Sequence, residues 1–478
     1  MFAQTSIPMD GFFGVNVFRC QESPEDIDDI SSWIRDYTHW SYFEPNNNEY
    51  RFMDAILPKI KDTVNYDDYY KQLKALGVQS LFVVMSSPKW ASSRPDDEKY
   101  DQFAPSLDQG GLEPEHYKEY AEFFYQLAAR YGGKKHDEKD LLTRDKLSGL
   151  DLVSVIEPEN EPDGPPDWGD QITLEEYAAM LNAAYDGNEG KLGKGYGVKA
   201  ADPDMPVSIG GLGFNLIALK EIVELAGRQP FDVINVHFYT FKHVRENYRI
   251  ATPPEWSSLE SDMREIAEWR NKNAPGKPVW LTEIGWDTKD YSTEQVSEQE
   301  AANYLIRSYL LSLGAGVEKC FWFIFRDLDD GGKPQVFSSS GLFENNNVEW
   351  QGKTRLKPKL TYWYNATFKS LTEDYVFEGD FHVLKDSTVR QYDFADADES
   401  KKLSVLWYCP KERKRWDPIP EPLEIDHDFQ VPEGWKLMKV LRPVDGTMKG
   451  KEVNFTTNQS DVKFKLDGTP VFVFLEKK

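Results

Sequence analysis

The order of local patterns along the chain is its strongest constraint on the fold. Between residues 11 and 371, short runs of β-branched and aromatic residues alternate with amphipathic stretches of helical spacing. Strands that alternate with helices form a parallel sheet, because each helix returns the chain to the side where the previous strand began. The expected strands are residues 11–18, 33–37, 78–85, 151–156, 207–210, 231–237, 279–283 and 317–325.

Eight strand–helix units favour a (β/α)8 barrel over a doubly wound open sheet. A doubly wound sheet normally has a glycine-rich phosphate loop after its first strand, and residues 14–24 (GVNVFRCQESP) do not form such a loop. After residue 371 the pattern changes to short alternating segments separated by Pro, Gly and Asp, which is typical of a β-sandwich. We therefore predict an α/β fold, with a catalytic (β/α)8 TIM barrel over residues 1–371 and a C-terminal β-sandwich domain over residues 372–478.

Charge and composition exclude several classes of partner. The net charge of −25 repels phosphate backbones and disfavours nucleic acid. No run of about 20 apolar residues is present, so no membrane span is expected. The three cysteines lack CxxC spacing and the seven histidines lack HxH or HxxxH spacing, so neither a metal site nor a cofactor is predicted. The aromatic content of 14% indicates that some rings face a ligand.

Two glutamates lie where the active face of a barrel is expected. Glu161 closes the segment 157–161 that follows the fourth strand, and Glu283 ends the seventh strand. The loops after the strands form the active face of such a barrel. Retaining hydrolysis of a glycosidic bond needs a carboxylic acid and a second carboxylate about 5 to 5.5 Å away. Glu161 and Glu283 are therefore the predicted catalytic pair.

The motifs around these glutamates resemble the signature of the clan A glycoside hydrolases. The matching positions are Asn160, Glu161 and Pro162 after the fourth strand, His237 and Tyr239 on the sixth, and Thr282 and Glu283 on the seventh. The resemblance covers most of residues 11–371 and, with the trailing sandwich, is most similar to family 39, although family 5 and several endohydrolase families share the motifs. It implies a retaining hydrolase that cleaves β-glycosidic bonds in an oligo- or polysaccharide, without a cofactor. Xylosyl, glucosyl, galactosyl and mannosyl units, and exo or endo action, stay open.

Several residues are expected to support the pair, with Glu161 as acid/base and Glu283 as nucleophile. Asn160 is expected to hydrogen-bond the 2-hydroxyl of the sugar. Tyr239 is expected to donate a hydrogen bond to Glu283, and Arg35 after the second strand to keep Glu283 ionised. Further predicted sugar-binding residues are His237 on the sixth strand and, as stacking platforms, Trp322 as first choice, then Trp90, Trp168 and Trp286.

Three alternatives remain at this stage. Glu157 and Glu159 compete with Glu161 for the acid role, but neither follows an asparagine. A catalytically silent carbohydrate-binding barrel would be expected to lack one of the two glutamates, and both are present. The C-terminal sandwich is predicted to be a packing domain rather than a carbohydrate-binding module, because no Gly/Ser linker precedes it.

A secreted, periplasmic or cell-surface location follows from the predicted function alone, since the first residues (MFAQTS) show no signal-peptide pattern.

Overall fold

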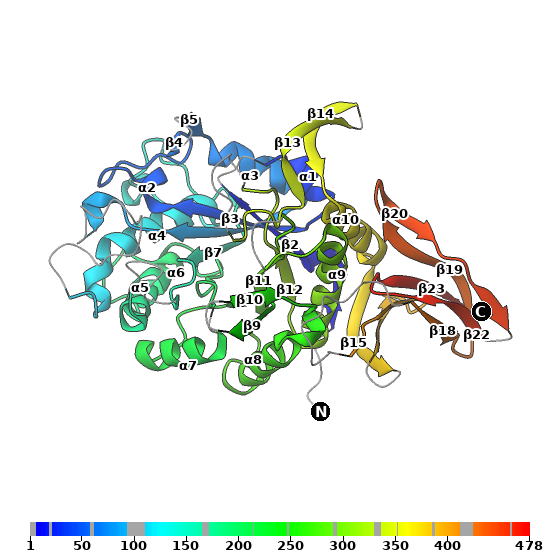
Figure 1. The fold of residues 1–478 in the computed structure, drawn as a ribbon. Coiled ribbons are helices and arrows are strands. Elements are labelled where there is room, and N and C mark those ends of the chain that lie inside the picture. Colours follow the sequence, from blue (N-terminus) through cyan, green and yellow to red (C-terminus); the bar gives the residue numbers. More distant parts are fainter. Residues whose placement is uncertain are drawn as a thin grey trace.

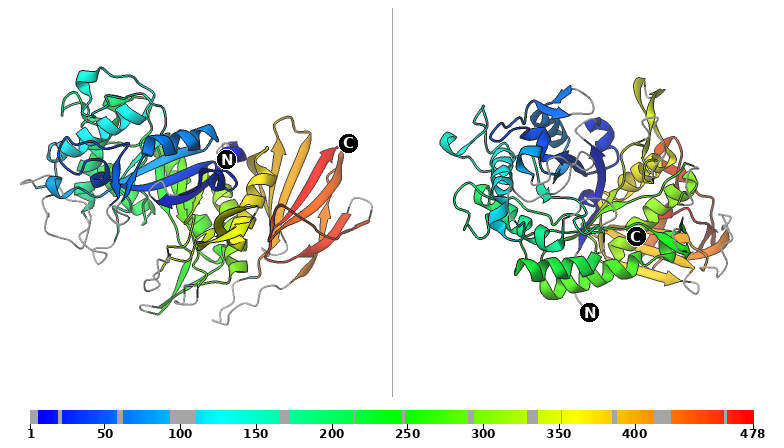
Figure 2. Two further views of the ribbon diagram at one scale, coloured as in Figure 1. Left: turned by 90° about the horizontal axis from the view of Figure 1, so that it is seen from above. Right: turned by 60° about the vertical axis from the view of Figure 1, so that its left-hand side comes forward.

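A computed structural model gives the fold of the chain. It describes residues 6–18, 22–57, 62–92, 110–164, 172–213, 215–245, 248–289, 294–328, 336–350, 352–384, 388–411, 424–458 and 461–478. Figure 1 shows an α/β part and a strand-rich C-terminal part, which lies on one side of it beyond helices α9 (Glu298–Gly314) and α10 (Leu360–Thr372). The two further views in Figure 2 show the same arrangement.

A seven-stranded sheet forms the centre of the α/β part. In spatial order its strands are β7 (Val155–Pro158), β6 (Gln79–Met85), β3 (Trp33–His39), β2 (Phe13–Phe18), β12 (Lys319–Trp322), β11 (Val279–Ile284) and β8 (Ile234–His237). Every neighbouring pair is parallel. The predicted α/β fold with a parallel sheet is therefore confirmed.

The predicted fifth strand, residues 207–210, differs from expectation. Among the described residues it forms single parallel bridges instead of a continuous strand. Val207 bridges to Ile156 of β7, and Ser208 bridges to Val233 just before β8. Further along, Gly211 bridges to Asn160 after β7, and Leu212 bridges to Val236 in β8. The segment 207–212 thus contacts both edge strands of the sheet through isolated hydrogen bonds.

Helices follow most strands of the sheet, as the alternation predicts. The longer ones besides α9 and α10 are α3 (Tyr66–Ala75), α4 (Lys118–Tyr131), α5 (Leu174–Asp186), α7 (Asn215–Ala226) and α8 (Leu259–Asn273). The short ones are α1 (Pro24–Asp28), α2 (Trp40–Phe43), α6 (Val198–Ala201) and single turns of 3₁₀ helix at Met9–Gly11, Lys89–Ala91, Pro114–Tyr117, Glu138–Asp140 and Pro254–Trp256. Capping residues explain several starts. Ser297 and Glu300 form a capping box at α9, and Ser23 accepts a hydrogen bond from the Asp26 N–H at α1.

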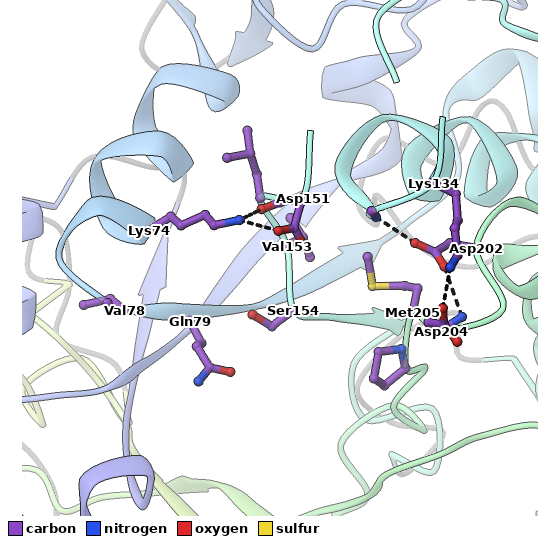
Figure 3. A pocket seen from close by; sticks show the side chains of 14 residues that line it. Lys74, Val78, Gln79, Lys134, Asp151, Val153, Ser154, Asp202, Asp204 and Met205 are labelled. Carbon is purple, nitrogen blue, oxygen red and sulfur yellow. Dashed lines mark hydrogen bonds and ion pairs between the residues drawn. The ribbon is translucent and has the colours of Figure 1, made fainter. Parts of the chain in front are cut away.

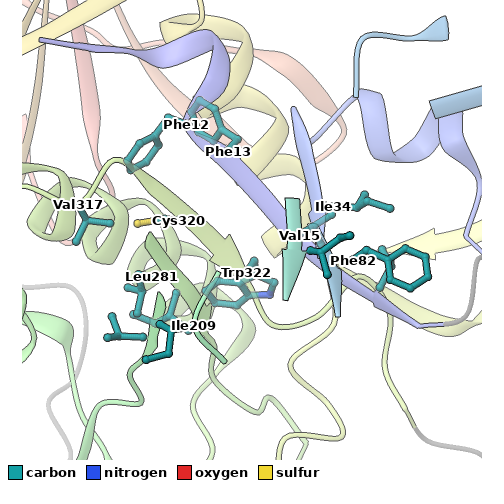
Figure 4. Close-up of a cluster of buried hydrophobic side chains, with 14 of the residues drawn as sticks. Phe12, Phe13, Val15, Ile34, Phe82, Ile209, Leu281, Val317, Cys320 and Trp322 are labelled. Carbon is teal, nitrogen blue, oxygen red and sulfur yellow. The ribbon is translucent and has the colours of Figure 1, made fainter. Parts of the chain in front are cut away.

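The hydrophobic core lies between the sheet and these helices. Figure 4 shows side chains from separate strands packed together, among them Val15 of β2, Leu281 of β11 and Trp322 of β12. Cys320 is buried in the same cluster. Among the described residues, no helix is both long and apolar enough to cross a lipid bilayer.

The C-terminal part consists of two antiparallel sheets. The larger has the order β1 (Ile7–Pro8), β15 (Tyr375–Leu384), β16 (Val389–Asp396), β17 (Lys401–Tyr408), β23 (Val471–Lys477), β19 (Trp435–Val444) and β20 (Thr447–Glu452). The smaller has the order β18 (Ile425–Gln430), β22 (Asp461–Leu466) and β21 (Thr456–Asn458). One buried cluster joins them, because it contains Phe464 of β22 and Val473 of β23. Phe472, the neighbour of Val473, belongs instead to the main core.

Three hairpins were not predicted from the sequence. They are β4 (Ala55–Leu57) with β5 (Asp62–Val64), β9 (Phe241–Arg245) with β10 (Tyr248–Ala251), and β13 (Phe343–Trp350) with β14 (Lys353–Pro358). The last of these ends at Pro358, and the final helix α10 begins at Leu360. Pro358 favours this boundary because proline disfavours helical backbone in the residue before it.

Candidate active site

The two predicted catalytic glutamates lie together at the carboxyl ends of the strands. Glu283 is on β11 and is 5% exposed, and Glu161 follows β7. The backbone N–H of Glu161 donates to the carbonyl of Gly211 over 2.9 Å, and its φ of +47° lies in the left-handed region. One oxygen of each carboxylate and a ring nitrogen of His237 all lie within 4.8 Å of one another. The structure thus brings the two carboxyl groups close together.

Hydrogen bonds hold both oxygens of Glu283. Its Oε1 accepts from the Arg35 guanidinium over 2.9 Å and from the Tyr37 hydroxyl. Its Oε2 accepts from the Tyr239 hydroxyl over 2.6 Å. Donors on both oxygens fix the orientation of the carboxylate.

Arg35, on β3, is fully buried between carboxylates. Its guanidinium donates to both oxygens of Glu157, over 2.7 and 3.1 Å, and to Oδ1 of Asn160 over 2.7 Å. Burial lowers the pKa of Arg35, but the charges of Glu157 and Glu283 outweigh it and raise the pKa above its ordinary value. Arg35 is therefore cationic and links the nucleophile candidate to the loop that carries Glu161.

Glu161 has a different environment from Glu283. Burial raises its pKa to about 7, although the Arg35 charge opposes this. Its Oε1 lies 2.7 Å from Nδ1 of His237. Burial also lowers the pKa of His237 to about 3, so the imidazole is neutral near pH 7. A neutral partner lets Glu161 hold its proton near neutral pH, as a general acid requires.

The same three groups, Glu161, His237 and Glu283, have the spacing of metal ligands. The buried guanidinium of Arg35, in contact with Glu283, places a positive charge beside them. This charge repels a divalent cation, and Oε1 of Glu283 already accepts two hydrogen bonds. The donor set therefore suits proton transfer and nucleophilic attack better than ion binding.

Glu161 and Glu283 line a cavity of about 570 Å³, and most of its described lining is aromatic. Its lining residues include Asn160, Glu161, His237, Tyr239, Glu283, Arg249, Met85, Phe18, Tyr37, Phe238, Phe241, Phe323 and Phe337. Phe18 stacks on Tyr37 at 4.7 Å between ring centroids, and Phe337 contacts Tyr239 at 4.2 Å. A cavity of this size and chemistry is typical of a small-molecule or sugar site.

Two of the four predicted tryptophan platforms need correction. Trp322 is completely buried, stacks on Trp286 at 5.8 Å, and donates to the carbonyl of Ser340. Trp286 is also buried, so neither ring is able to contact a sugar. Trp90 is half-buried and packs on Trp40 away from the described lining of the cavity. Trp168 lies outside the described residues.

Among the sequence-predicted residues, the structure brings Arg35, Asn160, Glu161, His237, Tyr239 and Glu283 into one network. Of the competing glutamates, Glu157 pairs with Arg35, whereas Glu159 points elsewhere. Glu159 accepts from the Tyr120 hydroxyl over 3.0 Å and from the Ser86 N–H over 3.3 Å. It is buried and does not line the cavity.

Sequence reasoning missed several cavity residues. Tyr37 is two residues beyond Arg35 on β3, so strand alternation places both on one face, and this signal was available. Phe323 follows Trp322 and so faces the opposite way, into the cavity. Phe337 lies in a loop after β12 and had no sequence signal.

A second cavity, of about 430 Å³, lies before the amino ends of β6, β7 and the segment 207–212 (Figure 3). Four of its charged side chains form ion pairs: Lys74 with Asp151, and Lys134 with Asp204. In folds of this kind the amino-terminal face contributes to stability, while the opposite face carries the chemistry. The cavity with the glutamates is therefore the candidate active site.

Comparisons with known proteins found a family match and several similar folds. The family described as "Glycosyl hydrolase catalytic core" matches residues 166–349. The fold is similar to that of a family 39 glycoside hydrolase from the gut symbiont Bacteroides cellulosilyticus WH2, with 18% identity, a TM-score of 0.65, and coverage of 99% of this chain and 81% of that one. No curated protein is significantly similar in sequence.

Two more solved structures share the fold. The family 30 xylanase Xyn30A from Clostridium acetobutylicum has 13% identity and a TM-score of 0.58, over 100% of this chain and 97% of that one. The family 51 α-L-arabinofuranosidase AbfB from Bifidobacterium longum has 11% identity and a TM-score of 0.58, over 99% and 97%. Families 39, 30 and 51 all belong to clan A, so the predicted resemblance to clan A glycoside hydrolases is confirmed. The family match supports glycoside hydrolase activity and a carbohydrate substrate.

Proposed function

We propose that the chain is a retaining glycoside hydrolase that cleaves β-glycosidic bonds in an oligo- or polysaccharide by double displacement. The observation that carries the proposal is the short distance between two carboxylates in contrasting environments. Oxygens of Glu161 and Glu283 lie within 4.8 Å, which suits the roughly 5 to 5.5 Å of retaining enzymes better than the roughly 6.5 to 9.5 Å of inverting ones.

In the first step, Glu283 attacks the anomeric carbon while Glu161 gives its proton to the departing oxygen. The hydrogen bonds from Arg35, Tyr37 and Tyr239 hold Glu283 in line for attack. Glu161 is the acid because burial keeps its pKa near 7. The products are a glycosyl ester on Glu283 and the released alcohol.

In the second step, Glu161 acts as a base and takes a proton from water, whose oxygen attacks the anomeric carbon of the ester. Glu283 leaves as a carboxylate and the sugar keeps its original configuration. His237 stays neutral throughout, since burial lowers its pKa to about 3. Asn160, held by Arg35, is placed to bind the 2-hydroxyl of the sugar.

We also propose that residues 1–371 form a (β/α)8 barrel closed by the segment 207–212. The bridges from this segment to β7 and β8 support closure. We further propose that residues 372–478 form a β-sandwich packing domain. The buried cluster shared by its two sheets supports the sandwich, and the packing of Phe472 in the main core supports a structural role.

Product release from a panel of β-linked plant, fungal and bacterial glycans tests the activity. Wild type is compared with Glu283→Gln, and Glu159→Gln is a matched control, because it makes the same change at a buried glutamate outside the cavity. We expect loss of activity only in Glu283→Gln, and chromatography of the products separates exo from endo action. Equal activity of Glu283→Gln and wild type would contradict the assignment of the nucleophile. Binding without hydrolysis by wild type would favour a silent carbohydrate-binding barrel.

The configuration of the first product tests the stereochemistry. Proton NMR during the first minutes of hydrolysis distinguishes the β-anomer from the α-anomer before mutarotation. We expect the β-anomer to form first. Initial release of the α-anomer would show inversion and contradict double displacement.

A further inference from the structure

Phe337 has an unusual backbone conformation at the wall of the cavity. Its φ is +70°, in the left-handed region, although it has a bulky side chain. Such a conformation costs on the order of 1 to 3 kcal/mol and persists only where surrounding contacts enforce it. The contacts of this loop therefore indicate what holds Phe337 in place.

Asp287 supplies these contacts. It lies four residues after Glu283 and is 2% exposed. Its Oδ2 accepts from the Phe337 N–H over 2.6 Å, and its Oδ1 accepts from the N–H and the hydroxyl of Ser339 over 2.8 and 3.0 Å. A buried carboxylate that accepts two backbone N–H groups defines the local backbone strongly. Asp287 thus fixes the direction in which the Phe337 side chain leaves the chain.

The ring of Phe337 packs on the tyrosine that contacts Glu283. The centroids of Phe337 and Tyr239 are 4.2 Å apart. Phe241 and Phe323 contact Tyr239 less closely, at 6.2 and 6.4 Å. The Tyr239 hydroxyl donates a hydrogen bond to Oε2 of Glu283. Phe337 is therefore the ring that most restricts rotation of Tyr239 away from this carboxylate.

We propose that Asp287 and Phe337 are positioning residues that hold Tyr239 against Glu283, so that its carboxylate is in line for attack. This inference rests on the proposed function, because it assigns Glu283 as the nucleophile. These contacts run from Asp287 to the Phe337 backbone and from the Phe337 ring to Tyr239. They join the loop after β12 to the loops after β8 and β11. Neither positioning residue takes part in bond making.

The rate of covalent labelling of Glu283 reports how well its carboxylate is positioned for attack. The probes are 2,4-dinitrophenyl 2-deoxy-2-fluoro-β-glycosides of xylose, glucose, galactose and mannose. The carboxylate attacks the anomeric carbon, dinitrophenolate leaves with the bonding electrons, and the fluorine slows hydrolysis of the ester. Since dinitrophenolate needs no proton, the labelling rate does not depend on Glu161 as an acid. Intact-mass spectrometry and absorbance report the rate.

Four single variants and one double variant test these contacts. We expect Phe337→Ala and Asp287→Asn each to slow labelling by on the order of 10- to 100-fold, the cost of a misplaced reacting group. Phe337→Tyr keeps the ring and should restore the rate. In the Tyr239→Phe background, Phe337→Ala should cause no further slowing, because the hydrogen bond that it supports is already absent. Thermal denaturation identifies any variant that fails to fold.

The outcomes are distinct. The inference is supported if Phe337→Ala is labelled more slowly than wild type while Phe337→Tyr is labelled at the wild-type rate. It also requires that Phe337→Ala cause no further slowing in the Tyr239→Phe background. Labelling of folded Phe337→Ala at the wild-type rate would overturn it while leaving the proposed function intact. So would a double variant whose slowing equals the product of the slowing by Phe337→Ala and the slowing by Tyr239→Phe. If wild type is not labelled by the probe of the sugar that it hydrolyses, the double-displacement mechanism itself fails, and the inference fails with it.

Discussion

Burial raises the pKa of Glu161 to about 7, and this value makes the activity depend on pH in a defined way. As the proposed general acid, Glu161 must be protonated in the free enzyme. With a pKa near 7, the protonated fraction is about 90% at pH 6 and about 10% at pH 8. We therefore expect kcat/KM to fall by roughly tenfold between pH 6 and pH 8.

Glu161→Gln identifies the group responsible for this fall. Glutamine has a similar shape and does not titrate, so the alkaline fall should disappear. His237 does not titrate in this range because burial lowers its pKa to about 3. The substitution should also reduce kcat/KM by about 10² to 10⁴ for a poor leaving group such as phenol. For 2,4-dinitrophenol, which needs no proton, the reduction should be much smaller.

The assay is the rate of release of substituted phenols from β-aryl glycosides of the preferred sugar, measured from pH 5 to pH 9. Two results would refute the reasoning. One is an alkaline fall near pH 7 that persists in Glu161→Gln. The other is an equal loss of rate for phenyl and dinitrophenyl glycosides, which would show that Glu161 is not the proton donor.

Two further predictions concern buried residues. Burial raises the pKa of Glu159 to about 8, against 4.5 for the ordinary side chain, so the folded state binds this proton more tightly. This contribution to stability is complete below pH 4.5 and is lost progressively as the pH rises from 4.5 through 8, by on the order of 5 kcal/mol. Calorimetry should therefore show a smaller fall in Tm from pH 5 to pH 9 for Glu159→Gln than for wild type, and equal falls would contradict the effect. Trp322→Phe should lower the free energy of unfolding by about 1 to 3 kcal/mol, because it removes buried volume and a hydrogen bond to Ser340, with KM nearly unchanged. A large rise in KM would instead support contact between Trp322 and the sugar.

The proposed catalytic pair was accessible from sequence because its signals are local. A strand can be recognised from a few residues, and the carboxyl ends of parallel strands meet at one face. Glu161 and Glu283 each follow or end such a strand, so their proximity follows from the fold class. Tyr239 and Arg35 were predicted for the same reason.

The face of each side chain and the paths of the loops depend on tertiary structure. Successive side chains on a strand point to opposite sides, so a shift of one residue decides between Trp322 in the core and Phe323 in the cavity. Phe337 contacts Tyr239 although the two lie far apart in the chain, and the buried carboxylate of Asp287 accepts a hydrogen bond from the Phe337 N–H.

The sequence by itself thus determined the parallel α/β architecture, the antiparallel strands after residue 371 and the two glutamates, since all three depend on periodicity and residue type. Tertiary structure decided the bridging role of 207–212, the buried state of Trp322 and the aromatic wall around Glu283. The physical reason is that these features depend on contacts between distant segments, whose free energies are not encoded in any short stretch of chain.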